Sequence, residues 1–137
     1  MGKVTILTGH FGSGKTEIAI NYALRLKAEG GAGQEVALVD LDLVNPYFRS
    51  REARRVVEEG GVRMVIPPAE VLQTDLPVIP AAVFSVLDEA RNGNWQVVID
   101  LGGNDQGALV LGQLRPQLSG MECDLWLVVN PYRPFNR

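Results

Sequence analysis

The sequence predicts an α/β fold in which helices cover both faces of a doubly wound, mainly parallel β-sheet. Short, nearly continuous apolar runs alternate along the chain with segments whose apolar residues recur every three or four positions. The first pattern is typical of strands buried on both faces of a parallel sheet, and the second of amphipathic helices. Clusters of Gly, Pro and Asn separate these segments. Right-handed crossovers between parallel strands would then place helices on both faces of the sheet.

The first half of the chain predicts three strands and two helices. We expect strands over residues 4–8, 35–43 and 62–66. The first helix begins near Glu17 and ends at the glycine-rich stretch 30–33. Its apolar residues follow the helical period: Ile18, Ala19, Tyr22, Ala23 and Leu26. A shorter helix over 49–59 is expected to bury Ala53, Val56 and Val57.

The second half predicts two helices and two strands. Pro80 can open a helix that ends at residues 92–94, and a strand over 95–101 follows it. We expect the next helix over 107–114, bent or ended before Pro116, and a last strand over 125–129 that ends at Asn130. The segment 69–77 has no clear period and is expected to be a loop.

Composition fits an ordinary globular domain. Hydrophobic residues make up 46% and charged residues 21% of the 137 positions, and we expect one domain over 1–137. The net charge of −3 gives no support for non-specific nucleic-acid binding. The single cysteine, Cys123, excludes an internal disulfide framework and a Cys-x-x-Cys metal site. No apolar run approaches the roughly 18 residues of a membrane span, and the N-terminus is expected to be a core strand rather than a signal peptide. We therefore expect a cytoplasmic protein.

A glycine-rich loop between the first strand and the first helix indicates phosphate binding. Residues 9–16 fit G-x-x-x-x-G-K-S/T, the P-loop pattern, in the strand–loop–helix context that the motif requires. Its glycines let the backbone turn successive N–H groups toward an anion at the positive end of the helix. Lys15 would reach the β- and γ-phosphates, and the Thr16 hydroxyl would ligate Mg²⁺. The predicted phosphate-binding residues are Gly9, Gly12, Ser13, Gly14, Lys15 and Thr16.

Acidic residues follow two of the expected strands at the edge where ligands bind in open α/β sheets. Asp100 and Asp40, with Thr16, are the candidate Mg²⁺ ligands, since this ion prefers one or two carboxylates plus waters and substrate oxygens. Asp42 would position or deprotonate the attacking water; alternatively, it is a surface acid that ends the strand. The loop glycine Gly103 would let the backbone approach the γ-phosphate.

Four segments together resemble the CobQ/CobB/MinD/ParA class of P-loop nucleotide-binding domains. They are residues 9–16, the Asp-x-Asp of 40–42, the Asp-Leu-Gly-Gly of 100–103 and the Val-Val-Asn-Pro of 128–131. The resemblance implies ATP hydrolysis coupled to a conformational switch, often with the nucleotide sandwiched in a homodimer. It also implies that Asn130 and Pro131 form one wall of the nucleotide pocket.

Two departures from this class leave alternatives open. His10 stands where members usually carry a second lysine that reaches the partner's phosphates, so a homodimer is only one possibility. The class also continues with further strands and a base-reading loop, which we expect this chain to lack; adenine and guanine therefore both stay open.

The leading hypothesis is Mg²⁺-dependent binding and hydrolysis of ATP or GTP that drives a switch, with an unidentified protein partner. One alternative is a kinase that transfers the γ-phosphoryl group to a small molecule, and the other is a non-catalytic nucleotide-binding module. An arginine cluster, Arg49, Arg51, Arg54 and Arg55, could approach the γ-phosphate, but a solvated helix face paired with nearby glutamates is the favoured interpretation.

Overall fold

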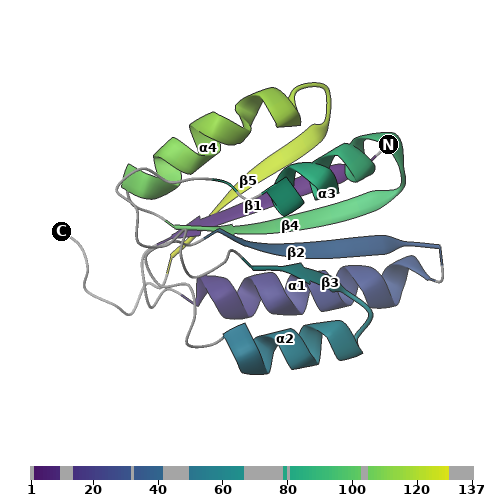
Figure 1. Ribbon diagram of the computed structural model, residues 1–137. Coiled ribbons are helices and arrows are strands. Elements are labelled where there is room, and N and C mark those ends of the chain that lie inside the picture. The colour runs from purple at the N-terminus through teal and green to yellow at the C-terminus, as the bar shows by residue number, and fades with distance from the viewer. Residues whose placement is uncertain are drawn as a thin grey trace.

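The computed structural model contains a single parallel sheet among the residues that it describes, which are 2–9, 14–31, 33–41, 50–66, 79, 81–102 and 105–129, with only the backbone at 50–53, 105 and 106. Its strands are β1 (Lys3–Gly9), β2 (Glu35–Leu41), β3 (Arg63–Val65), β4 (Trp95–Leu101) and β5 (Glu122–Val128). They lie in the order β3-β2-β4-β1-β5 (Figure 1). Every pair of neighbours is parallel, as the apolar runs predict.

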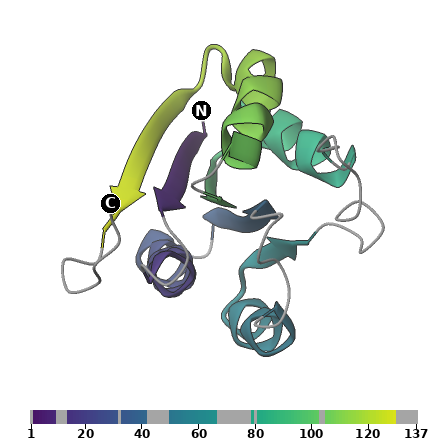
Figure 2. The ribbon, with the colours of Figure 1, turned by 90° about the vertical axis from the view of Figure 1, so that its left-hand side faces the viewer.

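Helices cover both faces of this sheet, which confirms the doubly wound arrangement. They are α1 (Lys15–Gly30), α2 (Ser50–Glu59), α3 (Ala81–Asn92) and α4 (Asp105–Leu118). Figure 2 shows α1 and α2 on one side of the sheet and α3 and α4 on the other. No helix in the described part of the chain is long and apolar enough to cross a membrane.

Two hydrophobic layers result, one on each side of the sheet. The alternation of side chains along β4 illustrates their separation: Ile99 packs in the layer of α3 and α4, and Val98 in the layer of α1 and α2. Asp100 lies two residues after Val98, so its carboxylate points to the same face of the sheet, the side of α1. The interior strands thus direct apolar side chains to both layers and one acid toward the start of α1.

Several expected boundaries are wrong by a few residues, and one helix continues past a proline where it could have ended. The structure continues α4 through Pro116 to Leu118, whereas the sequence predicts a helix bent or ended before the proline. Proline disturbs the carbonyl four residues earlier, which here belongs to Gly112. Because Pro116 lies near the helix end, only one late hydrogen bond is lost and the helix continues for two more residues.

The other differences are smaller. The described part of β2 reaches Leu41, and the rest of the strand expected to residue 43 lies outside the described residues. Strand β5 begins three residues earlier than expected, at Glu122. Helices α1 and α2 bury narrower faces than predicted, because Ile18 and Val56 are exposed while Ala19 and Val57 are buried.

Candidate functional site

The start of α1 lies at the carboxyl ends of the central strands. Gly14 precedes the helix with φ of 91°, a left-handed conformation that favours glycine. Because glycine has no side chain, Gly14 cannot accept a hydrogen bond from the N–H groups of the first helical turn. A helix start whose N-cap residue has no side-chain acceptor is suited to an anion at this edge of the sheet.

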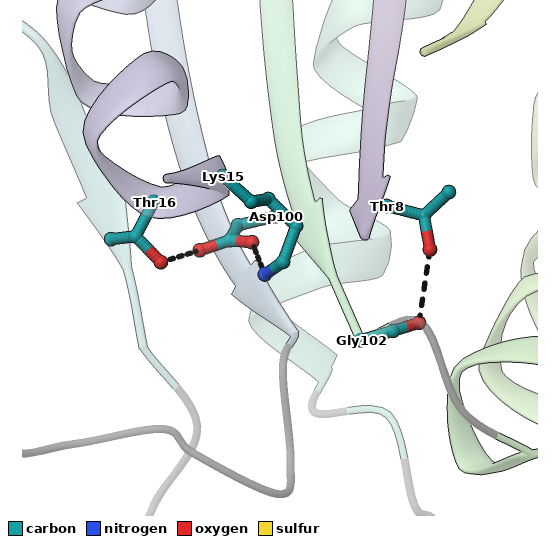
Figure 3. A network of polar contacts seen from close by, with 5 residues as sticks. All are labelled: Thr8, Lys15, Thr16, Asp100 and Gly102. Atoms are coloured by element: carbon teal, nitrogen blue, oxygen red, sulfur yellow. Dashed lines mark hydrogen bonds and ion pairs between the residues drawn. The ribbon is translucent and has the colours of Figure 1, made fainter. Parts of the chain in front are cut away.

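Three side chains from α1 and β4 form a buried polar network (Figure 3). Lys15 Nζ donates a hydrogen bond to Asp100 Oδ1 and forms an ion pair with it. Thr16 Oγ1 donates to the other carboxylate oxygen, Asp100 Oδ2, at 3.1 Å. Only 4% of Lys15 and 5% of Asp100 is exposed. The last two residues of the P-loop motif therefore contact the carboxylate that the sequence assigns to the metal.

Asp40 lies beside this network on the neighbouring strand. Parallel pairing of β2 with β4 places Asp40 directly opposite Asp100. Side chains of paired residues in parallel strands point to the same face, so both carboxylates are on the side of α1. Asp40 is also buried, with 8% exposed.

The donor set fits Mg²⁺. Carboxylate oxygens of Asp40 and Asp100 and the hydroxyl of Thr16 are hard oxygen ligands. No group of three or more His, Cys, Asp or Glu side chains that could hold a metal occurs within the described ranges.

The loop after β4 is anchored at its first residue by contacts that the sequence analysis missed. Thr8 Oγ1, near the end of β1, donates to the Gly102 carbonyl oxygen at 3.2 Å (Figure 3). A Cβ atom on Gly107 of α4 would lie 1.8 Å from that same oxygen. Glycine inside a helix is costly and is one sign of a close approach, but Gly112 in the same helix has open space around it, so the sequence does not single out Gly107. No pattern in the sequence indicates the Thr8 contact.

The remaining predicted site residues divide into two groups. Gly9 ends β1 and is buried. The others lie outside the described residues: Gly12, Ser13, Asp42, Gly103, Asn130 and Pro131. Of the arginine cluster, Arg54 is exposed and pairs with Glu58 one helical turn later, at 3.2 Å, as the solvated-face interpretation predicts.

A scan against models of known protein families finds no match to this chain, and a search of curated proteins likewise finds none.

Proposed function

We propose that this protein binds the polyphosphate of ATP or GTP together with Mg²⁺ and hydrolyses it to drive a conformational switch. The observation that carries the proposal is the convergence of Lys15 and Thr16, the end of a P-loop motif, on the buried carboxylate of Asp100. Burial of a lysine and an aspartate at the carboxyl edge of a parallel sheet is costly unless they act on each other or on a ligand. The sequence resemblance to MinD- and ParA-type domains supports the same function.

Each residue then has a role in binding or catalysis. Lys15 would bind the β- and γ-phosphate oxygens, and the α1 N-terminus would add its backbone N–H groups. Thr16, Asp100 and Asp40 would hold Mg²⁺, which supplies positive charge against the phosphate oxygens when bound. Asp42, the residue that follows Leu41 in the sequence, would orient the water that attacks the γ-phosphorus.

Binding tests the first part of the proposal. Calorimetry with Mg²⁺ and ATP or GTP is expected to register binding. Lys15→Ala should weaken it roughly 10- to 100-fold, because a charge-assisted hydrogen bond to phosphate is lost. Lys27→Ala is the matched control: this lysine is on the same helix but contacts the Gln34 carbonyl oxygen instead. No binding by the folded wild-type protein to either nucleotide would refute the proposal.

Product analysis tests the second part. Release of inorganic phosphate to water supports hydrolysis, whereas diphosphate formed only with an added acceptor supports a kinase. Binding without either product supports the non-catalytic module. Asp42→Asn should slow hydrolysis while leaving nucleotide affinity unchanged, and an equal loss of both would contradict the role given to Asp42.

A further inference from the structure

The two edges of the sheet differ in how well they are protected against pairing with another chain. Strand β3, at one edge, has only three residues and begins with the exposed Arg63. Two prolines, Pro67 and Pro68, follow it in the sequence. Short strands, charges and prolines are common means by which proteins prevent an edge strand from pairing with a second one. The edge at β3 is therefore protected.

Strand β5, at the other edge, lacks this protection (Figure 2). It has seven residues, pairs with β1 along its whole length without a bulge, and contains no proline. No strand among the described residues pairs with its outer edge. Residues 125–129 are all apolar, and Leu125, Leu127 and Val129 are more than half exposed. A long, straight and uncharged edge of this kind is suited to accept a further strand.

The charges of β5 decide how a second β5 strand could pair with it. Its two acids, Glu122 and Asp124, lie at its start, where both form ion pairs with Lys3 of β1. Parallel pairing of two β5 strands in register would place each acid opposite its own copy, and like charges directly opposite each other are destabilising. Antiparallel pairing instead places the acids of each copy opposite the uncharged end of the other.

Antiparallel pairing centred on Trp126 also matches the apolar side chains. Trp126 is then opposite the same residue of the second copy, and Leu125 is opposite Leu127 in two symmetric pairs. Directly opposed residues have their side chains on the same face of the sheet, where they contact each other. Because the same strand serves on both sides, the contact has two-fold symmetry and closes at a dimer.

We propose that β5 is a dimer interface, in which the outer edges of two β5 strands pair antiparallel and join two sheets into one. The second strand comes from a second copy of this chain. The apolar side chains of residues 125–129 expose roughly 400 Å² per copy, well under the roughly 800 Å² that each partner buries in a standard interface. The dimer should therefore be weak, with a Kd on the order of 10–100 µM. Below about 1 µM the chain should be a monomer whose β5 side chains are in water.

Sedimentation equilibrium of the full chain from about 5 to about 500 µM tests the dimer, because this range spans the expected Kd. The wild type should change from monomer to dimer. Leu127→Lys should weaken the association at least roughly tenfold, because it places an ammonium opposite Leu125 in both symmetric pairs. Val56→Lys is the matched control: Val56 is also more than half exposed but lies on α2, near the β3 edge, so the Kd should change by less than about twofold.

Two outcomes of this experiment would overturn the proposal. A wild type that stays monomeric at the highest concentration would show that the edge is unpaired or is covered by another segment of the same chain. A dimer that Leu127→Lys leaves unchanged would show that the copies meet elsewhere. Leu125→Lys is a second variant, which should weaken the dimer as much as Leu127→Lys because the two leucines oppose each other. Cooperative unfolding of each variant at submicromolar concentration checks that it folds.

The single cysteine makes the orientation of the two strands measurable. Cys123 is exposed on β5 and can carry a nitroxide spin label in the wild-type chain. It stands three residues before Trp126, so antiparallel pairing separates the two copies of Cys123 by six residue steps, roughly 20 Å. Double electron–electron resonance should give a label separation of about 20–30 Å, since the label linkers add to the backbone distance. Labels within about 10 Å would indicate parallel pairing, and labels beyond about 40 Å an interface away from β5; either would overturn the proposal.

The inference goes beyond nucleotide binding and stands or falls separately from it. None of these measurements contains nucleotide, and none of the variants changes a residue of the P-loop motif or of the polar network around Asp100. A monomeric wild type that binds Mg²⁺–ATP would refute the dimer and leave the proposed function intact. A dimer that binds neither ATP nor GTP would do the reverse.

Discussion

Strands β4 and β5 lie on either side of β1 and have similar apolar sequences, but their surroundings differ. In β4, Val98 and Ile99 are completely buried, each under a different pair of helices. In β5, Leu125 is 57% exposed and Leu127 70% exposed. Figure 2 shows β5 at the rim of the sheet, whereas β4 lies in the middle.

The contrast teaches that an apolar run predicts a strand that can be buried on both faces. Whether the strand is in fact buried depends on its position in the sheet and on the helices that cover it. On the α1 side, β5 is partly covered, because the rings of Trp126 and Tyr22 lie 4.7 Å apart between centroids. On the other face, the buried residues of α4, Val110 and Leu114, pack in the core cluster that contains Ile6 and Ile99. Edge strands that are long and apolar are liable to pair with other chains.

The largest expected effect is in the buried strand. Ile99→Ala removes a fully enclosed side chain from the centre of the α3–α4 layer and should lower the free energy of unfolding by about 2–5 kcal/mol. Urea denaturation measures this change. A loss below about 1 kcal/mol would mean that β4 is no better packed than β5, and the comparison would fail.

The next effect concerns how closely α4 approaches the end of β4. Gly107→Ala should destabilise the protein by about 1–3 kcal/mol, because its Cβ would overlap the Gly102 carbonyl oxygen. Gly112→Ala, on the same helix with open space around the added atom, should instead be neutral or stabilise by up to about 1 kcal/mol. Denaturation of both variants compares them directly, and equal effects would contradict the close contact.

A smaller effect is expected at the rim. Leu127→Lys should change the free energy of unfolding by no more than about 0.5 kcal/mol, because most of the side chain is already in water. It should raise the concentration at which the protein stays in solution, since charges on an edge strand oppose pairing. Destabilisation comparable to that of Ile99→Ala would show that Leu127 is covered in solution.

The smallest effect concerns the thiol at the start of β5. Cys123 is exposed, but contact with its neighbours desolvates the thiol in part and raises its pKa, and the nearby Asp124 carboxylate raises it further. A raised pKa leaves less thiolate at pH 8, so alkylation by iodoacetamide should be slower than for a free cysteine. Asp124→Asn removes the second cause and should speed the reaction by no more than about threefold, with Asp88→Asn as the control. Equal rates would show that burial alone sets the pKa.

The fold class and the centre of the candidate site follow from local sequence patterns. Periodicity and stop residues locate the segments, and the P-loop pattern places Lys15 and Thr16 at the start of a helix. The strand order depends on long-range pairing, so no local pattern shows that Asp40 is opposite Asp100. The contact between Thr8 and Gly102 joins residues 94 positions apart, so local sequence patterns cannot predict it either. Exposure of β5 could not be predicted, because its composition is that of an interior strand.

Asp100 lies beside Lys15 because successive side chains along β4 point to opposite faces of the sheet. One extra residue within the strand would turn the acid into the α3–α4 layer and present an aliphatic side chain to the lysine. Such an insertion would keep every residue of the site but would remove the contact between Asp100 and Lys15. A two-residue insertion would return the Asp100 side chain to the α1 face, two residues further along the strand. Changes in the length of this strand are therefore tolerated, if at all, in pairs.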